Sequence, residues 1–359
     1  MSEIVVDQSV LKEIENFQLP TDLSFGKALS PFMIECDYAD GKWGDLKLSP
    51  YRKLELDPTC KVLHYAQEIF EGLKAYRVKG QGPFLFRPDE NAKRFNISAL
   101  RMAMPELPVE TFISSVKAIT EYSAHFIPQR SGDSLYIRPF MIAMDNNLGI
   151  KPSETFKYMV VASPSAAYFS SGSVNVLIEK GAVRACPGGV GASKTGGNYA
   201  ASLLSMIQAK KKGFDQVLWL DAVEKTYVEE MSGMNFFAVY GEKLVTPELT
   251  ETILEGITRK SILSYAEFIG LKVEEVKLSY KDLIADIKSG ACTEAFACGT
   301  AVIITPISSL GFSDGEKIHL SSPNGKVTQK LREGLLGIQE GRIEDPFNWR
   351  IEVNQKFKK

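Results

Sequence analysis

The sequence predicts an α+β protein built from two domains. Its 359 residues exceed the usual length of a single hydrophobic core, so two domains are expected. Strand-like and helix-like segments occur in groups and do not alternate strictly, which is typical of α+β folds. The stretch Ser163–Ser173 is rich in Ser, Pro, Ala and Gly and indicates a linker. We therefore expect a smaller α/β domain over residues 1–167, a linker over 168–174 and a larger domain over 175–359.

The N-terminal half begins with hairpin patterns. Phe32–Cys36 and Leu46–Leu48 flank a turn that contains Asp40-Gly41, a pair favoured in tight hairpin turns. Two helices that each open at a proline follow a second hairpin around Gly80-Gln81-Gly82. The expected segments are strands 71–77 and 83–87, helices from Pro88 to about Met104 and from Pro108 to about Tyr122, and strands 134–139 and 156–162.

The C-terminal half mixes strands and helices, with no internal repeat. The expected strands are 174–178, 217–220, the run 227–240, 294–297 and 301–304, and the expected helices lie after Gly197, near 254–268, near 280–287 and near 324–336.

Composition argues against several classes of protein. Hydrophobic residues at 44% and charged residues at 24% describe an ordinary globular chain. The net charge is −2 and there is no long basic run, so the sequence lacks the clustered positive charge that binds nucleic acid. The five cysteines are odd in number and form no C-x-x-C pair, so neither structural zinc nor a disulfide framework is expected. Without a signal-peptide or membrane-span pattern, we expect a cytoplasmic location and no membrane partner.

One lysine stands inside a loop of small residues. Lys194 lies between Gly188 and Gly197, and a helical pattern follows with one apolar side made of Ala200, Leu203, Leu204 and Ile207. A long amine held among Gly, Ala and Ser suits a side chain that forms a Schiff base with a carbonyl. Glycines beside it let the backbone approach a planar ligand closely.

Two other interpretations of this loop stay open. The lysine would be solvated if the loop were a plain turn before a helix. The phosphate loop G-x-x-x-x-G-K-[ST] nearly fits, but Ser193 stands at the position of its last glycine. That loop should also follow a buried strand, and Arg184–Pro187 does not have the pattern of one.

A cofactor held as a Schiff base also needs an acid at its ring nitrogen. Glu230 is the candidate, because it lies between two strand-like runs of the segment Tyr227–Phe237. Its neighbour Glu229 should point to the opposite face of the strand. The alternative is that both glutamates form a solvated edge, since most carboxylates are exposed.

Phosphate is bound by backbone N–H groups, hydroxyls and arginine. The segment Leu254–Arg259 places Gly, Ile and Thr where a helix should begin, and Ala297–Ala301 contains a second Gly-Thr turn. Arg94 lies on the first predicted helix. Each feature alone is more often a cap or a surface residue, but with Lys194 they form a set.

These features together resemble a branched-chain amino-acid aminotransferase, of the type IV pyridoxal-phosphate fold shared with D-amino-acid aminotransferase and aminodeoxychorismate lyase. The resemblance covers nearly the whole chain, from Phe25-Gly26-Lys27 to the C-terminal helix. Six motifs in order carry it: residues 65–75 (YAQEIFEGLKA), 136–139 (YIRP), 194–199 (KTGGNY), 216–220 (QVLWL), 230–235 (EMSGMN) and 299–301 (GTA).

The resemblance implies a two-domain α+β homodimer that transfers amino groups between leucine, isoleucine or valine and 2-oxoglutarate. The larger domain would carry Lys194, which would bind pyridoxal 5'-phosphate and move the proton. Glu230 would hold the ring nitrogen and Tyr199 the phenolic oxygen. The phosphate would be bound by Arg94, Ile257, Thr258 and Thr300. The substrate side would be lined by Phe25, Tyr65 (across a dimer), Phe70, Tyr136, Tyr168 and Gly233, with Arg138 at the distal carboxylate of glutamate and Thr300-Ala301 at the α-carboxylate.

One departure from the family matters. Animal members carry a redox-active Cys-x-x-Cys after the Gly-Thr-Ala turn, where this chain has Val302 and Thr305. The sequence is therefore more similar to the bacterial type. A D-amino-acid aminotransferase or lyase of the same fold, a phosphate-loop nucleotide-binding protein and a non-catalytic binding protein remain as alternatives.

Overall fold

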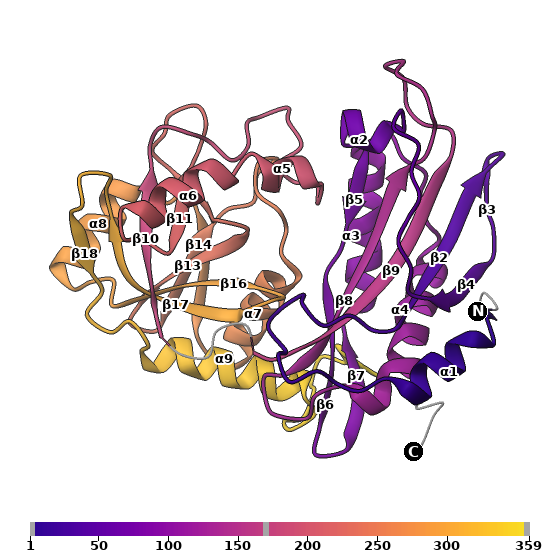
Figure 1. The fold of residues 1–359 in the computed structure, drawn as a ribbon. Coiled ribbons are helices and arrows are strands. Elements are labelled where there is room, and N and C mark those ends of the chain that lie inside the picture. The colour runs from indigo at the N-terminus through magenta and orange to yellow at the C-terminus, as the bar shows by residue number, and fades with distance from the viewer. Residues whose placement is uncertain (1–3, 168–171, 355–359) are drawn as a thin grey trace. The chain divides into compact units, whose positions relative to one another are not determined.

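The computed structural model describes residues 4–167 and 172–354 of the chain (Figure 1). Of these, residues 4–167, 193–196 and 337–354 form one compact unit, called unit 1 below. Residues 172–192 and 197–336 form a second, called unit 2. Each unit is built around its own large sheet. The mixture of large sheets and grouped helices confirms the predicted α+β class.

Unit 1 contains a ten-stranded sheet in the order β1-β4-β2-β9-β8-β6-β7-β19, with β3 beside β2 and β5 beside β8. Its strands are β1 (Ile4–Val6), β2 (Phe32–Ala39), β3 (Lys42–Trp43), β4 (Leu46–Pro50), β5 (Glu68–Phe70), β6 (Leu73–Val78), β7 (Gln81–Phe86), β8 (Ser134–Ala143), β9 (Phe156–Ser165) and β19 (Arg350–Glu352). The predicted hairpin turn is confirmed, because Asp40 and Gly41 both adopt positive φ, 52° and 74°.

The helices of unit 1 are α1 (Ser9–Asn16), α2 (Lys61–Tyr65), α3 (Pro88–Arg101) and α4 (Val109–Ser123), followed by a 3₁₀ turn at Ala124–Phe126. Both helices predicted to open at a proline are present. α3 and α4 pack together beside the sheet (Figure 1), where Phe95, Phe112 and Tyr158 are buried in the core. This packing fixes α3, the helix that carries Arg94.

Unit 2 contains a nine-stranded mixed sheet in the order β12-β11-β10-β17-β16-β13-β14-β15, with β18 beside β17. Its strands are β10 (Val174–Glu179), β11 (Gln216–Leu220), β12 (Val228–Met231), β13 (Met234–Tyr240), β14 (Lys243–Pro247), β15 (Lys272–Val276), β16 (Glu294–Gly299), β17 (Ile303–Gly311) and β18 (Lys317–His319). The helices are α6 (Leu203–Lys211), α7 (Ile257–Phe268), α8 (Tyr280–Ser289) and most of α5 (Gly196–Ala200) and α9 (Lys326–Gln339), of which Gly196 and residues 337–339 belong to unit 1.

Two segments belong to unit 1 although the sequence assigned them to the C-terminal domain. They are residues 193–196, which include Lys194, and residues 337–354. Backbone hydrogen bonds explain both placements: Phe70 N donates to Lys194 O over 3.0 Å, and β19 pairs with β7. The linker predicted at 168–174 falls partly on residues 168–171, which lie outside the described residues, so that boundary stays a prediction.

Three local differences follow from backbone chemistry. The helix expected from about Leu254 begins at Ile257, because Gly256 is its extended N-cap. The strand expected from Ala301 begins at Ile303, after the Thr300 turn. The apolar side of α6 is exposed at Leu203, Leu204 and Ile207, so this helix does not bury the residues that the pattern aligned.

Within the described ranges, no helix combines the length and the apolar character that crossing a bilayer requires.

Candidate active site

The Lys194 loop is fixed to unit 1 by its backbone. Lys194 N donates to Ser98 Oγ on α3 at 2.9 Å, and Thr195 Oγ1 donates to Glu68 O at 2.8 Å. Gly196 N donates to the Glu68 carboxylate, and burial raises the pKa of that carboxyl above its ordinary value. These bonds hold the loop while the Lys194 side chain lies over the ring of Phe70, with Nζ 4.9 Å from the centroid.

A buried ion pair lies behind this lysine. Glu71 accepts from Arg94 at both carboxylate oxygens, with Nε to Oε1 at 2.7 Å and Nη2 to Oε2 at 2.8 Å. Burial alone would raise the pKa of Glu71, but the charges of Arg94 and Lys194 and the hydrogen bonds it accepts hold it below its ordinary value. Arg94, predicted as a phosphate ligand, is therefore already held by a carboxylate.

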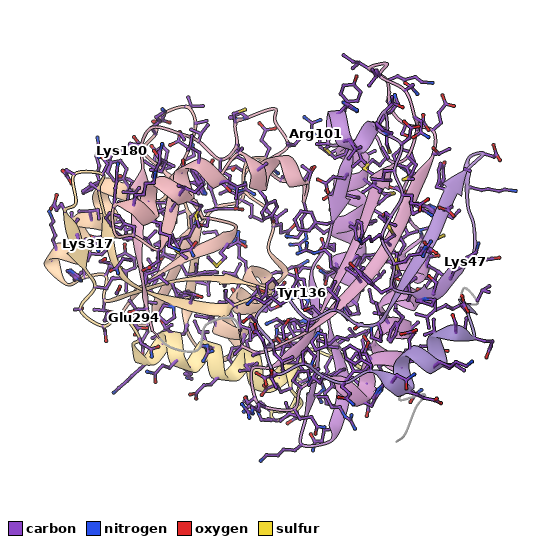
Figure 2. The ribbon with its side chains drawn as sticks, in the orientation of Figure 1. Lys47, Arg101, Tyr136, Lys180, Glu294 and Lys317 are labelled. Atoms are coloured by element: carbon purple, nitrogen blue, oxygen red, sulfur yellow. The ribbon has the colours of Figure 1, made fainter. Side chains whose placement is uncertain are left out.

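Four of the predicted substrate residues form one cluster in unit 1. Phe25 packs edge-on against Tyr136, with ring centroids 4.7 Å apart. The Arg138 guanidinium lies 4.6 Å from the centroid of Phe70 and donates from Nη2 to Tyr136 Oη at 2.9 Å. Tyr136, labelled in Figure 2, lies on β8 two residues before Arg138. A Cβ at Gly72 would collide with the Tyr136 hydroxyl, so this tyrosine position requires glycine there.

Two predicted substrate residues are not joined to this cluster. Tyr65, at the C-terminal end of α2, is exposed, and its hydroxyl donates to Leu148 O. Tyr168 lies outside the described residues. The roles of both stay predictions.

Glu230 lies on β12 of unit 2 with 2% of its surface exposed. Its Oε1 accepts from Leu254 N at 2.6 Å, and its Oε2 lies 3.0 Å from Arg184 Nε. Arg184 is oriented in turn by backbone carbonyls, since its Nη1 donates to Thr252 O at 2.9 Å. A buried carboxylate beside a buried guanidinium suits a group that must remain an anion.

The alternative of a solvated Glu229–Glu230 edge is wrong. Both are buried, because every residue of β12 is buried. Glu229 accepts from Thr252 Oγ1 through Oε1, while its Oε2 has no hydrogen-bond partner among the residues that the structure describes. Burial raises the pKa of Glu229 above its ordinary value. The environments of the two glutamates thus differ: Glu230 is paired with the Arg184 cation, whereas the carboxyl of Glu229 is buried with one oxygen that accepts no hydrogen bond from the described residues.

The remaining predicted cofactor residues of unit 2 lie at turns and at one helix start. Tyr199 lies on α5, and its ring would be 3.2 Å from a Cβ added at Gly233. Ile257 and Thr258 form the first turn of α7 and are both buried. Thr300 and Ala301 follow β16, before Ile303 takes a positive φ of 65°. Backbone N–H groups at such places are suited to anions.

The family model for amino-transferase class IV matches residues 68–310. The chain belongs to the class IV aminotransferases. It is 45% identical to a protein named probable branched-chain-amino-acid aminotransferase from Streptomyces coelicolor, over 94% of this chain and 95% of that protein. It is 46% identical to the branched-chain-amino-acid aminotransferase of Mycolicibacterium smegmatis, over 92% of each chain. Within class IV, the chain is therefore a member of the branched-chain amino-acid aminotransferase family.

Solved relatives have the same fold. The branched-chain amino acid aminotransferase from Escherichia coli superimposes with a TM-score of 0.72 at 27% identity, covering 90% of this chain and 100% of that one. A second solved branched-chain amino acid aminotransferase, complexed with N-(5'-phosphopyridoxyl)-L-glutamate, gives a TM-score of 0.71 at 29% identity, covering 89% of this chain and 98% of that one. The cofactor of this class IV aminotransferase is pyridoxal 5'-phosphate.

The donor groups of the predicted residues suit that cofactor. They are the Lys194 amine, the Arg94 guanidinium, the buried Glu230 carboxylate and the first turn of α7. The phosphate-loop alternative is wrong, because no strand directly precedes the Lys194 loop over residues 180–193. Sequence reasoning gave no role to Glu71 or Arg184. Glu71 stands inside the motif at 65–75, but its burial was not visible there.

Proposed function

We propose that this aminotransferase exchanges an amino group between leucine, isoleucine or valine and 2-oxoglutarate, giving branched-chain 2-oxo acids and glutamate. The observation that supports these two kinds of substrate, one apolar and one with a second carboxylate, is the position of two cations over one ring. Lys194 Nζ and the Arg138 guanidinium lie 4.9 and 4.6 Å from the centroid of Phe70. An apolar ring and a guanidinium thus both lie near the same amine, and these are the groups that an apolar side chain and a carboxylate would each need.

In this proposal seven residues would hold the cofactor. Lys194 would bind its aldehyde carbon, Glu230 its ring nitrogen and Tyr199 its phenolic oxygen. Four residues would bind its phosphate: Arg94, Ile257, Thr258 and Thr300. When bound, pyridoxal phosphate supplies an electron sink for the negative charge that develops at the substrate Cα.

The protein's own groups then carry the proton and hold the charges. Once the substrate amine has displaced it from the aldehyde carbon, the Lys194 amine would accept the proton from the substrate Cα and deliver it to that carbon, as a general base and then a general acid. Glu230 remains an anion beside Arg184, 3.0 Å away, and keeps a proton on the ring nitrogen. The Thr300-Ala301 turn holds the α-carboxylate, which all the substrates share.

Substrate choice depends on the cluster around Arg138. The apolar wall is supplied by Phe25, Phe70 and Tyr136. Further predicted members are Tyr65, Tyr168 and, at the cofactor side, Gly233. A second carboxylate entering that wall costs several kcal/mol unless it is paired. Arg138 is suited to pair with it, because its fork binds carboxylates bidentately. Its buried Nε has no hydrogen-bond partner among the described residues, which leaves a donor for such a group.

The experiment is a comparison of single-turnover rates for leucine and glutamate in the wild type and in Arg138→Gln. Loss of one charge-assisted contact corresponds to about a 10- to 150-fold change. The rate for glutamate should fall by that factor and the rate for leucine should change little. Equal losses for both amino acids would show that Arg138 has a structural role. Activity with D-amino acids in place of L-leucine would favour the sibling activity, D-amino-acid aminotransferase.

We further propose a cytoplasmic homodimer in which Tyr65 of one protomer completes the substrate side of the other. The support is the exposed position of Tyr65 together with that of its neighbour Leu63 on α2. Sedimentation of the purified enzyme would show one species at twice the chain mass.

A further inference from the structure

Glu71 is the most completely enclosed carboxylate of the candidate site. It connects β5 to β6, and none of its surface is exposed. Four hydrogen bonds reach it: two from Arg94 at 2.7 and 2.8 Å, one from Asn91 Nδ2 at 2.7 Å and one from Gly72 N at 3.1 Å. Three of these four end on Oε2.

Stability alone gives little reason for such a pair. Taking two charges out of water costs several kcal/mol per ion, and well-packed apolar residues often stabilise a fold as well or better. The hydrogen bonds compensate Glu71 for the water that it loses on burial. Together with the nearby charges of Arg94 and Lys194, they hold its pKa below the ordinary value. The pair is therefore ionic, and its effect has to be sought in what it orients.

The geometry of the pair fixes the plane of the arginine. Glu71 accepts hydrogen bonds from Nε and Nη2 of Arg94, the side-on edge of the guanidinium, in a bidentate contact. Two contacts to one planar group determine both its position and its rotation. The end-on pair of N–H groups, one on each Nη atom, consequently points away from Glu71. Arg94 also lies on α3, whose Ser98 binds the backbone of Lys194.

We propose that Glu71 is a positioning residue for the cofactor phosphate: it holds the Arg94 guanidinium side-on, so that the end-on fork is presented to that phosphate. The inference rests on the proposed role of Arg94. It names Glu71 as a residue that acts through Arg94 and does not touch the cofactor or the substrate.

The test is equilibrium binding to apoenzyme of pyridoxal 5'-phosphate and of pyridoxal, which has the same ring and aldehyde but lacks the phosphate. In Glu71→Gln the charge is lost while the volume is kept. Affinity for pyridoxal phosphate should fall by about 10- to 150-fold, as for one charge-assisted contact. Affinity for pyridoxal, which also depends on Lys194, should stay unchanged.

The matched control is Glu35→Gln, because Glu35 on β2 is paired with Arg52, whose Nη2 lies 2.9 and 2.8 Å from its two oxygens. This variant loses a glutamate–arginine pair of the same unit and should bind both compounds like the wild type. Glu71→Asp keeps the charge but shortens the side chain, and should show a smaller loss confined to pyridoxal phosphate. It keeps the test valid if Glu71→Gln does not fold.

Double variants separate the possible outcomes. Arg94→Gln should weaken binding of pyridoxal phosphate selectively, and adding Glu71→Gln should cause little further loss, because the two act through one contact. If Arg94→Gln does not distinguish the two compounds, the role proposed for Arg94 fails and the inference fails with it. If Arg94→Gln does distinguish them but the Glu71 variants weaken both compounds equally, or neither, the inference alone is overturned.

Discussion

Each unit of this aminotransferase buries a glutamate against an arginine, but the two pairs are built in opposite ways. In unit 1, Arg94 gives Nε and Nη2 to the two oxygens of Glu71. In unit 2, Arg184 reaches Glu230 through Nε at 3.0 Å and directs Nη1 to the Thr252 carbonyl at 2.9 Å. Arg94 thus uses two nitrogens on the carboxylate, whereas Arg184 contacts the carboxylate with one nitrogen and a backbone carbonyl with another.

This difference separates what each pair fixes. A bidentate contact from a fully buried carboxylate fixes the arginine, which agrees with the proposed role of Arg94 as the cofactor ligand of the unit 1 pair. Backbone carbonyls fix Arg184, so it presents a stationary positive charge, which agrees with the proposed role of Glu230 as the cofactor ligand of the unit 2 pair. A buried Glu–Arg contact therefore does not reveal by itself which partner contacts the cofactor. The remaining hydrogen bonds of each partner support the proposed assignment in each unit.

Replacing Lys194 should give the largest effect and would test whether the unit 1 pair acts independently of this amine. In Lys194→Ala, turnover of leucine with 2-oxoglutarate should fall by at least about 10⁴-fold, because the covalent attachment and the proton carrier are both lost. The absorbance of lysine-bound cofactor should disappear. Pyridoxal phosphate should still bind more tightly than pyridoxal, since Arg94 and Glu71 are intact.

The control for this variant is Lys180→Ala, because Lys180 of unit 2 contacts the rings of Tyr280 and Phe312, outside the proposed site. Near-native turnover in Lys194→Ala would refute the assignment of the catalytic lysine.

Replacing Glu230 should give the next largest effect and tests the unit 2 pair directly. Glu230→Gln removes the anion and leaves Arg184 with an uncompensated positive charge near the ring nitrogen. The half-reaction with leucine should slow by about 10²- to 10³-fold, the cost of removing one preorganised electrostatic group. Cofactor should remain bound. Rapid-mixing spectroscopy of the half-reaction measures this, and an unchanged rate would show that another group holds the ring.

Much of the fold could be predicted from the sequence, and the sequence also named candidate site residues whose roles stay predictions. Strand periodicity, the Asp40-Gly41 turn and the opening prolines gave most elements near their observed positions. Lys194 was selected because a lysine is unusual in a loop of small residues, and Glu230 because it lies between two strand-like runs and matches the motif of the family. The elements α1, α2, β1 and β19 were missed. Of these, α2 has five residues and β1 and β19 have three each, too few to show a period.

The supporting residues could not be predicted, for a physical reason. Glu71 and Arg94 are distant in sequence, as are Arg184 and Glu230, and a charged residue is most often exposed. Nothing local indicates that both members of a pair are buried, because burial is set by how sheets and helices pack. The same limit explains why Lys194 was assigned to the C-terminal domain: the backbone bonds to Phe70 and Ser98 that attach it to unit 1 are long-range contacts.

Replacing Glu229 should give the smallest effect on activity and sharpens the contrast with its neighbour. Glu229 is 6% exposed and its pKa is raised, chiefly by burial, so its carboxyl keeps a proton in the folded protein to a higher pH than in the unfolded chain. The stabilisation that comes from this proton is complete below the ordinary pKa of 4.5 and is lost as the pH rises through the raised value. Glutamine resembles the protonated form and cannot ionise. The free energy of unfolding of Glu229→Gln, relative to the wild type, should therefore increase from pH 4 to pH 8, by roughly 1.4 kcal/mol for each unit of the pKa shift. Urea unfolding at the two pH values measures this free energy.

The rate of the leucine half-reaction in Glu229→Gln should change by less than about tenfold, below the effect of a charge-assisted contact. Rapid-mixing spectroscopy of that half-reaction measures the rate. A greater loss of rate in Glu229→Gln than in Glu230→Gln would reverse the assignment, and Glu229 would then be the carboxylate at the ring nitrogen.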